Sequence, residues 1–161
     1  MNLYVVLHKF KIMILDKSDA YFMGEAFKEA NKAFSLGEIP IGAVIVSDQQ
    51  IIARAHNLTE QLKDVTAHAE MQAFTAAAEY LGGKYLKDCT LYVTIEPCVM
   101  CSGASYWTQL KKVVYGAKDS KRGVSKLGVS LFHPKTIIQS GILEKECAEL
   151  MQSFFSKKRG K

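Results

Sequence analysis

The sequence lacks a long uninterrupted hydrophobic run and any internal repeat, and we expect no secretory leader at its start. Its apolar start is interrupted by His8, Lys9 and Lys11, and it is too short to span a bilayer as a helix. No basic segment precedes the apolar residues, and no small-residue cleavage site follows them. We therefore expect a cytoplasmic protein that does not span a membrane, and we treat the chain as a single domain.

Cysteine is also sparse, with four residues in the whole chain: Cys89, Cys98, Cys101 and Cys147. In a cytoplasmic protein a C-x-x-C pair indicates a metal site or a catalytic element more often than a disulfide. We expect Cys98 and Cys101 to form such a pair. Cys89, at the start of a strand, and Cys147, on a helix, are typical of small buried apolar residues.

The remaining composition is that of a globular protein with a substantial core. The chain has 161 residues, of which 48% are hydrophobic and 23% are charged. We predict an N-terminal extension over residues 1–17, a folded domain over 18–156 and a basic C-terminal tail over 157–161. The net charge is +5, and its excess is concentrated in residues 111–126 and in the tail. Either run alone fits a solvated face or a frayed end, but two basic regions together favour a polyanionic partner.

Hydrophobic periodicity predicts helices that alternate with strands after an initial hairpin. A mixed sheet with helices on both faces, hence an α/β fold, follows from this order. Helices are expected over 18–37, from 66 to the Gly82-Gly83 pair, over 99–110 and over 143–155. Strands are expected in 41–56, where two runs flank a turn at 47–50, in 89–95 and 112–116, and possibly within 130–141.

Three potential metal ligands fall at the starts of two of these helices. Cys98 and Cys101 are one helical turn apart, and the positive end of a helix favours the thiolate form. His68 can add an imidazole nitrogen, and two sulfurs with one nitrogen suit Zn²⁺. No other Cys or His forms a second close-spaced pair. The fourth coordination position is therefore expected to be open, as a catalytic zinc requires.

Glu70, two residues after His68, is the candidate catalytic residue. A carboxylate beside an open coordination position can take a proton from water and pass it to a leaving nitrogen. His-Ala-Glu at one helix start, followed by a strand and Pro-Cys-x-x-Cys at the next, is the known signature of zinc nucleobase deaminases.

With these motifs the chain resembles the cytidine deaminase-like superfamily and, within it, the bacterial tRNA-specific adenosine deaminases. The likeness runs from about residue 18 to residue 159. Its matching segments include "IPIGAVIV", "AHN", "DVTAHAEMQA", "CTLYVTIEPCVMCSGA", "VVYGAKDSKRG", "LFHP" and "GILEKECAELMQSFF". The zinc motif belongs to the whole superfamily. The basic "GAKDSKRG" stretch and the aromatic, basic C-terminus resemble the tRNA-specific adenosine deaminases in particular.

This resemblance implies a three-layer α/β/α fold with a five-stranded mixed sheet, a homodimer, and one Zn²⁺ per subunit. It implies conversion of the wobble adenosine of a tRNA anticodon stem-loop to inosine. By motif, Glu70 would shuttle protons and His68, Cys98 and Cys101 would bind the metal. The residues that match substrate contacts of the family are Asn57, Asp119, Lys121, Phe154 and Phe155.

Two other functions stay open at this point. The segment after "LFHP" is shorter than in many relatives and belongs to the RNA side of the family fold, which leaves a deaminase of free guanine, cytosine or cytidine as an alternative. The basic regions argue against that alternative. The other alternative is a zinc-stabilised binding module without catalysis. Glu70 beside an open coordination position argues against it.

Overall fold

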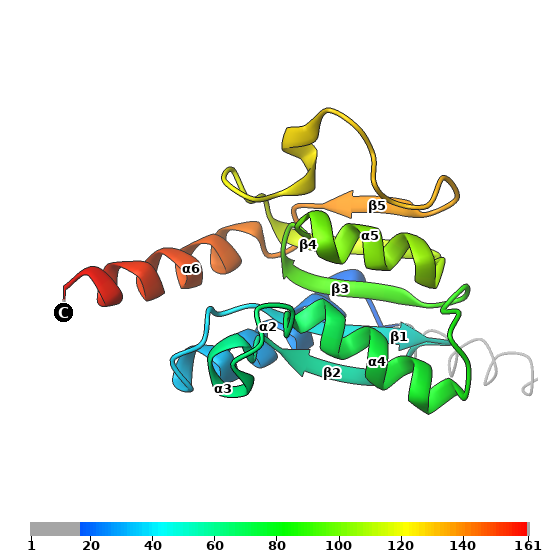
Figure 1. Ribbon diagram of the computed structural model, residues 1–161, viewed down its shortest axis with the longest axis horizontal. Coiled ribbons are helices and arrows are strands. Elements are labelled where there is room, and N and C mark those ends of the chain that lie inside the picture. The colour runs from blue at the N-terminus through cyan, green and yellow to red at the C-terminus, as the bar shows by residue number, and fades with distance from the viewer. Residues whose placement is uncertain (1–16, 161) are drawn as a thin grey trace, which may run out of the picture.

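A five-stranded mixed sheet forms the centre of the protein (Figure 1). The computed structural model describes residues 17–160, so nearly all of the expected extension over 1–17 lies outside the described residues, as does Lys161. The strand order is β2-β1-β3-β4-β5. Strand β1 pairs antiparallel with β2 and β3, whereas β3, β4 and β5 are parallel. The strands are β1 (Gly42–Ser47), β2 (Gln50–His56), β3 (Thr90–Ile95), β4 (Lys112–Ala117) and β5 (Ile137–Ser140).

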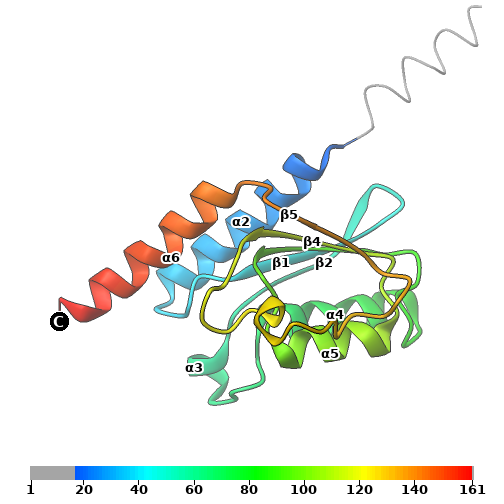
Figure 2. The same ribbon diagram turned by 90° about the horizontal axis from the view of Figure 1, so that it is seen from above.

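Helices cover both faces of the sheet, which confirms the three-layer α/β/α prediction. Figure 2 shows α2 (Asp19–Ser35) and α6 (Glu144–Arg159) on one face, and α4 (Ala69–Leu81) and α5 (Val99–Thr108) on the other. Because side chains alternate along a strand, β1 sends Ala43 and Ile45 into the core under α4, and Val44 into the core under α2. The strand is therefore apolar throughout rather than alternating.

Gly42 allows α2 to approach the sheet closely. A Cβ at this position would overlap the backbone of Ala26 and Ala30 on α2. Those two alanines are themselves fully buried. A larger side chain at either position would push the helix away from the sheet. Close packing of α2 on β1 thus depends on small residues on both elements.

The predicted helix ends are largely confirmed. Ser18 caps α2 by accepting a hydrogen bond from the backbone N–H of Tyr21, 3.2 Å away. Gly82 ends α4 in the left-handed conformation that favours glycine. The C-terminus differs from the prediction, because residues 157–159 continue α6 as its last turn instead of forming a separate tail. Basic side chains there interact favourably with the negative end of the helix dipole.

Two short elements were not anticipated. A four-residue helix, α3 (Thr59–Leu62), interrupts the segment between β2 and α4, and a 3₁₀ helix, η1 (Val124–Leu127), follows β4. Both are too short for a periodic hydrophobic pattern to indicate them. Among the described residues, no helix combines the length and the apolar character needed to cross a bilayer.

Candidate active site

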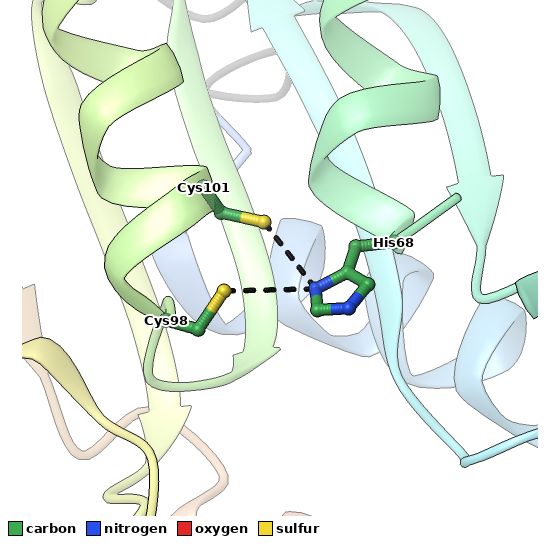
Figure 3. Close-up of side chains that lie close together, drawn as sticks. All are labelled: His68, Cys98 and Cys101. Atoms are coloured by element: carbon green, nitrogen blue, oxygen red, sulfur yellow. Dashed lines mark hydrogen bonds between the residues drawn. The ribbon is translucent and has the colours of Figure 1, made fainter. Parts of the chain in front are cut away.

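The N-termini of α4 and α5 meet at one end of the sheet. His68 is the N-cap residue of α4, and Cys98 is the N-cap residue of α5. Strand β3 ends at Ile95, and Pro97 then directs the chain into α5. Figure 3 shows His68 and the two cysteines pointing toward one another from these two helices.

The three predicted metal ligands converge on one point. The Sγ atoms of Cys98 and Cys101 each lie 3.6 Å from Nδ1 of His68. The three ligand atoms all lie within 4.8 Å of one another. A tetrahedral zinc ion with ordinary Zn–S and Zn–N bond lengths requires a sulfur–nitrogen separation of about 3.5 Å. The separation of the donor atoms therefore fits zinc.

The other cysteines and histidines of the described part of the chain do not join this group. Cys89 and Cys147 are buried in separate parts of the core, as expected. His56 Nδ1 lies 3.2 Å from a carboxylate oxygen of Glu29. His133 lies against the ring of Tyr106. Among the described residues, none of these side chains lies with the three ligand atoms.

The electrostatics of the ligands favour metal binding. A hydrogen bond from the Cys101 thiol, together with one from His68, lowers the pKa of Cys98 to about 4. The same contact with Cys98 raises the pKa of Cys101, which retains the shared proton. The neighbouring Cys98 also raises the pKa of His68. Because a metal binds thiolates and neutral imidazole, its binding would release the protons that this cluster holds.

Glu70 lies in the first turn of α4 and is almost completely buried, with 3% of its surface exposed. Its Oε2 atom is buried and has no hydrogen-bond partner among the described residues. Burial raises the pKa of the carboxyl group to about 7. An unpartnered buried polar atom is costly, so this oxygen is available for a ligand or a substrate atom. A carboxyl group with a pKa near neutrality can both accept and donate a proton.

Asn57 follows β2, and its neighbour Leu58 is bonded to the segment that leads into α4. Its backbone N–H donates to the carbonyl oxygen of Ile41, 3.0 Å away. The backbone N–H of Leu58 donates to the carbonyl oxygen of Ala67, the residue before His68, also over 3.0 Å. The second of these bonds joins the segment that carries Asn57 to the residue before the N-cap of α4.

The loop between β4 and η1 carries Asp119 and Lys121. Oδ1 of Asp119 accepts hydrogen bonds from the backbone N–H groups of Lys121 (2.8 Å) and Arg122 (2.9 Å), so this oxygen closes the turn of the loop. The side chains of Lys121 and Arg122 are exposed. An isolated β-bridge between Cys98 and Gly123 holds the loop beside the start of α5.

Hydrogen bonds to the Glu96 carboxylate hold the loop between β4 and η1 at the site. The sequence leaves open whether this residue orients a neighbour or lies on the surface, and the structure buries it. Its carboxylate accepts from the backbone N–H groups of Asp119 (3.1 Å) and Ser125 (2.8 Å). A Cβ at Gly123 would overlap this carboxylate, so only glycine fits there.

The two phenylalanines of α6 have different environments. Phe154 is 4% exposed, and its ring packs edge-on against Phe34 with 5.7 Å between centroids. Phe155 is 39% exposed. Figure 1 shows α6 extending beyond the sheet at the end where α4 and α5 begin. Of the two, only Phe155 offers a substantial free ring surface.

One buried residue of this region was missed by the sequence reasoning. Glu38, between α2 and β1, is fully buried, and its carboxylate accepts a hydrogen bond from Nδ2 of Asn57 over 3.0 Å. The local sequence "SLGEIPIG" carries no signal that the carboxylate points inward. Its partners lie about 20 residues away, in the segment after β2.

The chain is similar to known deaminases over most of its length. The model of the MafB19-like deaminase family matches residues 17–159. A tRNA-specific adenosine deaminase of Bacillus subtilis (strain 168) is 46% identical over 148 residues, which cover 89% of this chain and 92% of the relative. A similar protein of Aquifex aeolicus is 43% identical over 143 residues, 86% of this chain and 95% of the relative.

A solved structure from studies of A-to-I editing by tRNA:A34 deaminases at the wobble position superimposes with a TM-score of 0.76 and 41% identity. It covers 81% of this chain and 98% of its own. By the extent of these matches, the chain belongs to the MafB19-like deaminase family and groups with the tRNA-specific adenosine deaminases.

Proposed function

We propose that the protein is a zinc-dependent hydrolase that converts the wobble adenosine of a tRNA anticodon loop to inosine and ammonia. The observation that carries this proposal is the convergence of His68, Cys98 and Cys101 beside the unpartnered, buried Oε2 atom of Glu70. Sequence relatives that match most of the chain are tRNA-specific adenosine deaminases.

His68, Cys98 and Cys101 would hold one zinc ion per chain. Bound zinc supplies Lewis-acid activation of water at near-neutral pH. Cys101 and Glu70 are buried, whereas His68 and Cys98 are partly exposed. Around the buried groups charge–charge and charge–dipole interactions are stronger than in water.

Glu70 performs the proton transfers. Its carboxylate takes a proton from the attacking water, whose oxygen forms a bond to C6 of adenine. The carboxyl group then delivers this proton to the ring nitrogen N1, takes a second proton from the new C6 hydroxyl, and delivers that one to the departing amino group. The C6–N6 bond breaks, ammonia leaves, and the base is hypoxanthine. A pKa of about 7 suits a group that must both accept and donate at neutral pH.

The RNA would approach over the loop at 118–125 and the end of α6. The loop carries the exposed cations Lys118, Lys121 and Arg122, and the last turn of α6 adds Lys157, Lys158 and Arg159. Cationic side chains bind phosphates, and an exposed ring such as Phe155 can stack on an unpaired base. The target adenosine lies in a single-stranded loop, which lowers the cost of extruding it into the site. Asn57 would contact the nucleoside there, and Asp119 would present the basic loop to the RNA.

A homodimer in the cytoplasm completes the proposal. The exposed face of α5 supports it, because Trp107 is 76% exposed and stands edge-on against the half-exposed Tyr106. An exposed tryptophan beside a tyrosine is typical of a surface that a partner covers. A second copy of the chain is the partner that we propose.

A free-base deaminase is the second candidate. A guanine deaminase structure from Bacillus subtilis superimposes with a TM-score of 0.62 and 39% identity, and it covers 70% of this chain and 71% of its own. The zinc ligands and Glu70 would serve either reaction equally. The basic loop and the basic end of α6 favour RNA, because a small neutral base has no phosphates for them to bind.

One set of parallel reactions separates these functions. The zinc-loaded protein is incubated with an anticodon stem-loop that carries a wobble adenosine and, separately, with guanine, cytosine and cytidine. Inosine in the stem-loop, with ammonia released in equal amount, is the expected result. Ammonia from a free base alone would show that the second candidate is correct, and the absence of turnover on every substrate would overturn both.

A further inference from the structure

Glu38 is buried without a cationic partner. None of its surface is exposed, and no described lysine, arginine or histidine forms an ion pair with it. A carboxylate in this position must be satisfied by hydrogen-bond donors. The donors are Nδ2 of Asn57 (3.0 Å), Oγ1 of Thr59 (3.3 Å), and the backbone N–H groups of Glu60 (3.2 Å) and Gln61 (2.8 Å).

These contacts determine how the Asn57 amide is oriented. An ionised carboxylate only accepts hydrogen bonds, so the NH₂ group of Asn57, and not its oxygen, faces Glu38. The second N–H of the same group donates to Oγ1 of Thr59, 3.0 Å away. Both donors of the amide are therefore used, and Oδ1 is the only polar atom of the side chain left without a partner among the described residues.

The same contacts link Glu38 to the ligand cluster. Its bonds to Glu60 and Gln61 hold the first turn of α3. The adjoining Leu58 donates its backbone N–H to the carbonyl oxygen of Ala67, immediately before His68. Glu38 thus holds the segment at 57–61, which in turn is bonded through Leu58 to the residue before His68.

We propose that Glu38 is a positioning residue that locks Asn57 as a pure hydrogen-bond acceptor for the substrate. This inference rests on the proposed function, in which Asn57 contacts the target nucleoside. The substrate group that meets Oδ1 must then be a donor. Within an RNA chain an adenosine offers two such donors, the ribose 2′-hydroxyl and the 6-amino group, whereas its unprotonated ring nitrogens only accept.

A polar swap tests the proposal. In Glu38→Gln an NH₂ group can face the NH₂ group of Asn57, so two donors meet and the hydrogen bond is lost. In Asn57→Asp two carboxylates face each other, and the bond is lost again. Each single variant is expected to raise KM by about 10- to 100-fold, with a smaller change in kcat, because a ground-state contact is lost. In the double variant E38Q/N57D the amide introduced at the first position can donate to the carboxylate introduced at the second, and an oxygen again faces the substrate. Its KM is expected to return to within about fivefold of wild type by the same reasoning.

Matched controls separate positioning from folding. Glu79→Gln makes the same chemical change on an exposed residue of α4 and should leave KM and kcat unchanged. Bound zinc is measured for every variant. The side-chain amide resonances of Asn57, observed by NMR, should shift in Glu38→Gln and not in Glu79→Gln, and this readout needs no turnover. The proposal is overturned if the single variants keep the wild-type KM, or if the double variant is no better than either single.

The kinetic comparison uses whichever substrate the wild-type protein turns over, so failure of the proposed function is seen first in the wild type and is distinct from failure of this inference. A stem-loop with 2′-deoxyadenosine at the target position identifies the donor. If the 2′-hydroxyl meets Oδ1, Glu38→Gln adds no further penalty on the deoxy substrate. If the 6-amino group meets it, the penalty is the same on both substrates.

Discussion

His68 and Cys98 are both N-cap residues, one of α4 and the other of α5, and the Sγ atom of Cys98 lies 3.6 Å from Nδ1 of His68. Neither side chain makes a capping hydrogen bond to its own helix. Both are thus free to turn toward a shared ligand at the positive ends of two helix dipoles. The same dipoles favour the thiolate form of Cys98, which is the form that binds a metal.

Replacing Glu70 by glutamine should abolish turnover and leave zinc and RNA binding intact. The amide keeps the size of the side chain but cannot carry the proton, so we expect kcat to fall by at least about 100-fold. The measurement is inosine formation in the stem-loop, with zinc content and RNA affinity determined on the same sample. Near-normal turnover would refute the acid/base role.

Removing a metal ligand should release zinc and lower thermal stability. We expect Cys101→Ser to lose most bound zinc, because a serine hydroxyl is a poor zinc ligand. Chelation of the wild-type metal should lower Tm, since a ligand that binds only the folded state stabilises it. Cys147→Ser, at the buried thiol outside the cluster, is the control for zinc content. Equal zinc in both variants would contradict the assignment.

Gly123→Ala should displace the loop at 118–125 away from Glu96 and from the start of α5. The added methyl group would overlap the Glu96 carboxylate, and overpacking of this kind typically costs about 1–3 kcal/mol. We expect weaker RNA binding, and zinc content is measured on the same sample because Gly123 is bridged to Cys98. Gly103→Ala is the control, because a Cβ there meets no atom within 4 Å and alanine favours the helix. If both variants bind RNA equally well, Glu96 does not position the loop.

RNA binding should weaken steeply with salt, and less steeply once basic side chains are removed. Each phosphate contact to a single strand contributes about −0.7 to the slope of log K against log salt. Lys121→Ala combined with Arg122→Ala should therefore flatten that slope by roughly 1 to 1.5. Lys84→Ala with Lys87→Ala removes the same charge near the end of α4 away from the site and should leave the slope unchanged. A flat response in the wild type would indicate a small free substrate.

The ion pair of Asp19 with Lys112 should contribute a stability that disappears in acid. Burial raises the pKa of Asp19, but hydrogen bonds from Tyr92 (2.7 Å) and Lys112 (2.9 Å) outweigh it, and the net pKa lies below the usual value of 3.8. A carboxyl group whose pKa is lowered by folding stabilises the protein above its unfolded pKa, and this is lost as the pH falls through the folded pKa.

Asp19→Asn should accordingly lower the free energy of unfolding at pH 7 by about 1 kcal/mol, a value reduced for partial exposure of the pair. The difference from wild type should shrink as the pH falls below 3.8. Urea unfolding at a series of pH values measures it. A difference that stays constant down to pH 2 would show that the ion pair is not its source.

The grouping of His68, Cys98 and Cys101 agrees with the sequence prediction, which rested on two short motifs and on their likeness to a known signature. His68 and Glu70 share one helix start, and Cys98 and Cys101 share another. The sheet and its helices followed in the same way from apolar periodicity. Each of these features depends on residues within a few positions of one another.

The roles of Glu38 and Glu96 could not be predicted, because each depends on donors that are distant in sequence. Glu38 is satisfied by the segment at 57–61, and Glu96 by the loop at 119–125. A glutamate in a local window is usually a surface residue, and only the folded chain shows these two turned inward. Phe154 and Phe155 illustrate the same limit, since adjacent identical residues have opposite environments.

The most direct test of the central claim is a zinc titration of the metal-free protein followed by inosine formation at the wobble position of the stem-loop. We predict that turnover rises in proportion to bound zinc and saturates at one ion per chain, and that the Glu70→Gln variant binds the same amount of zinc without forming inosine. Turnover that is independent of zinc, or that persists in this variant, would contradict the account.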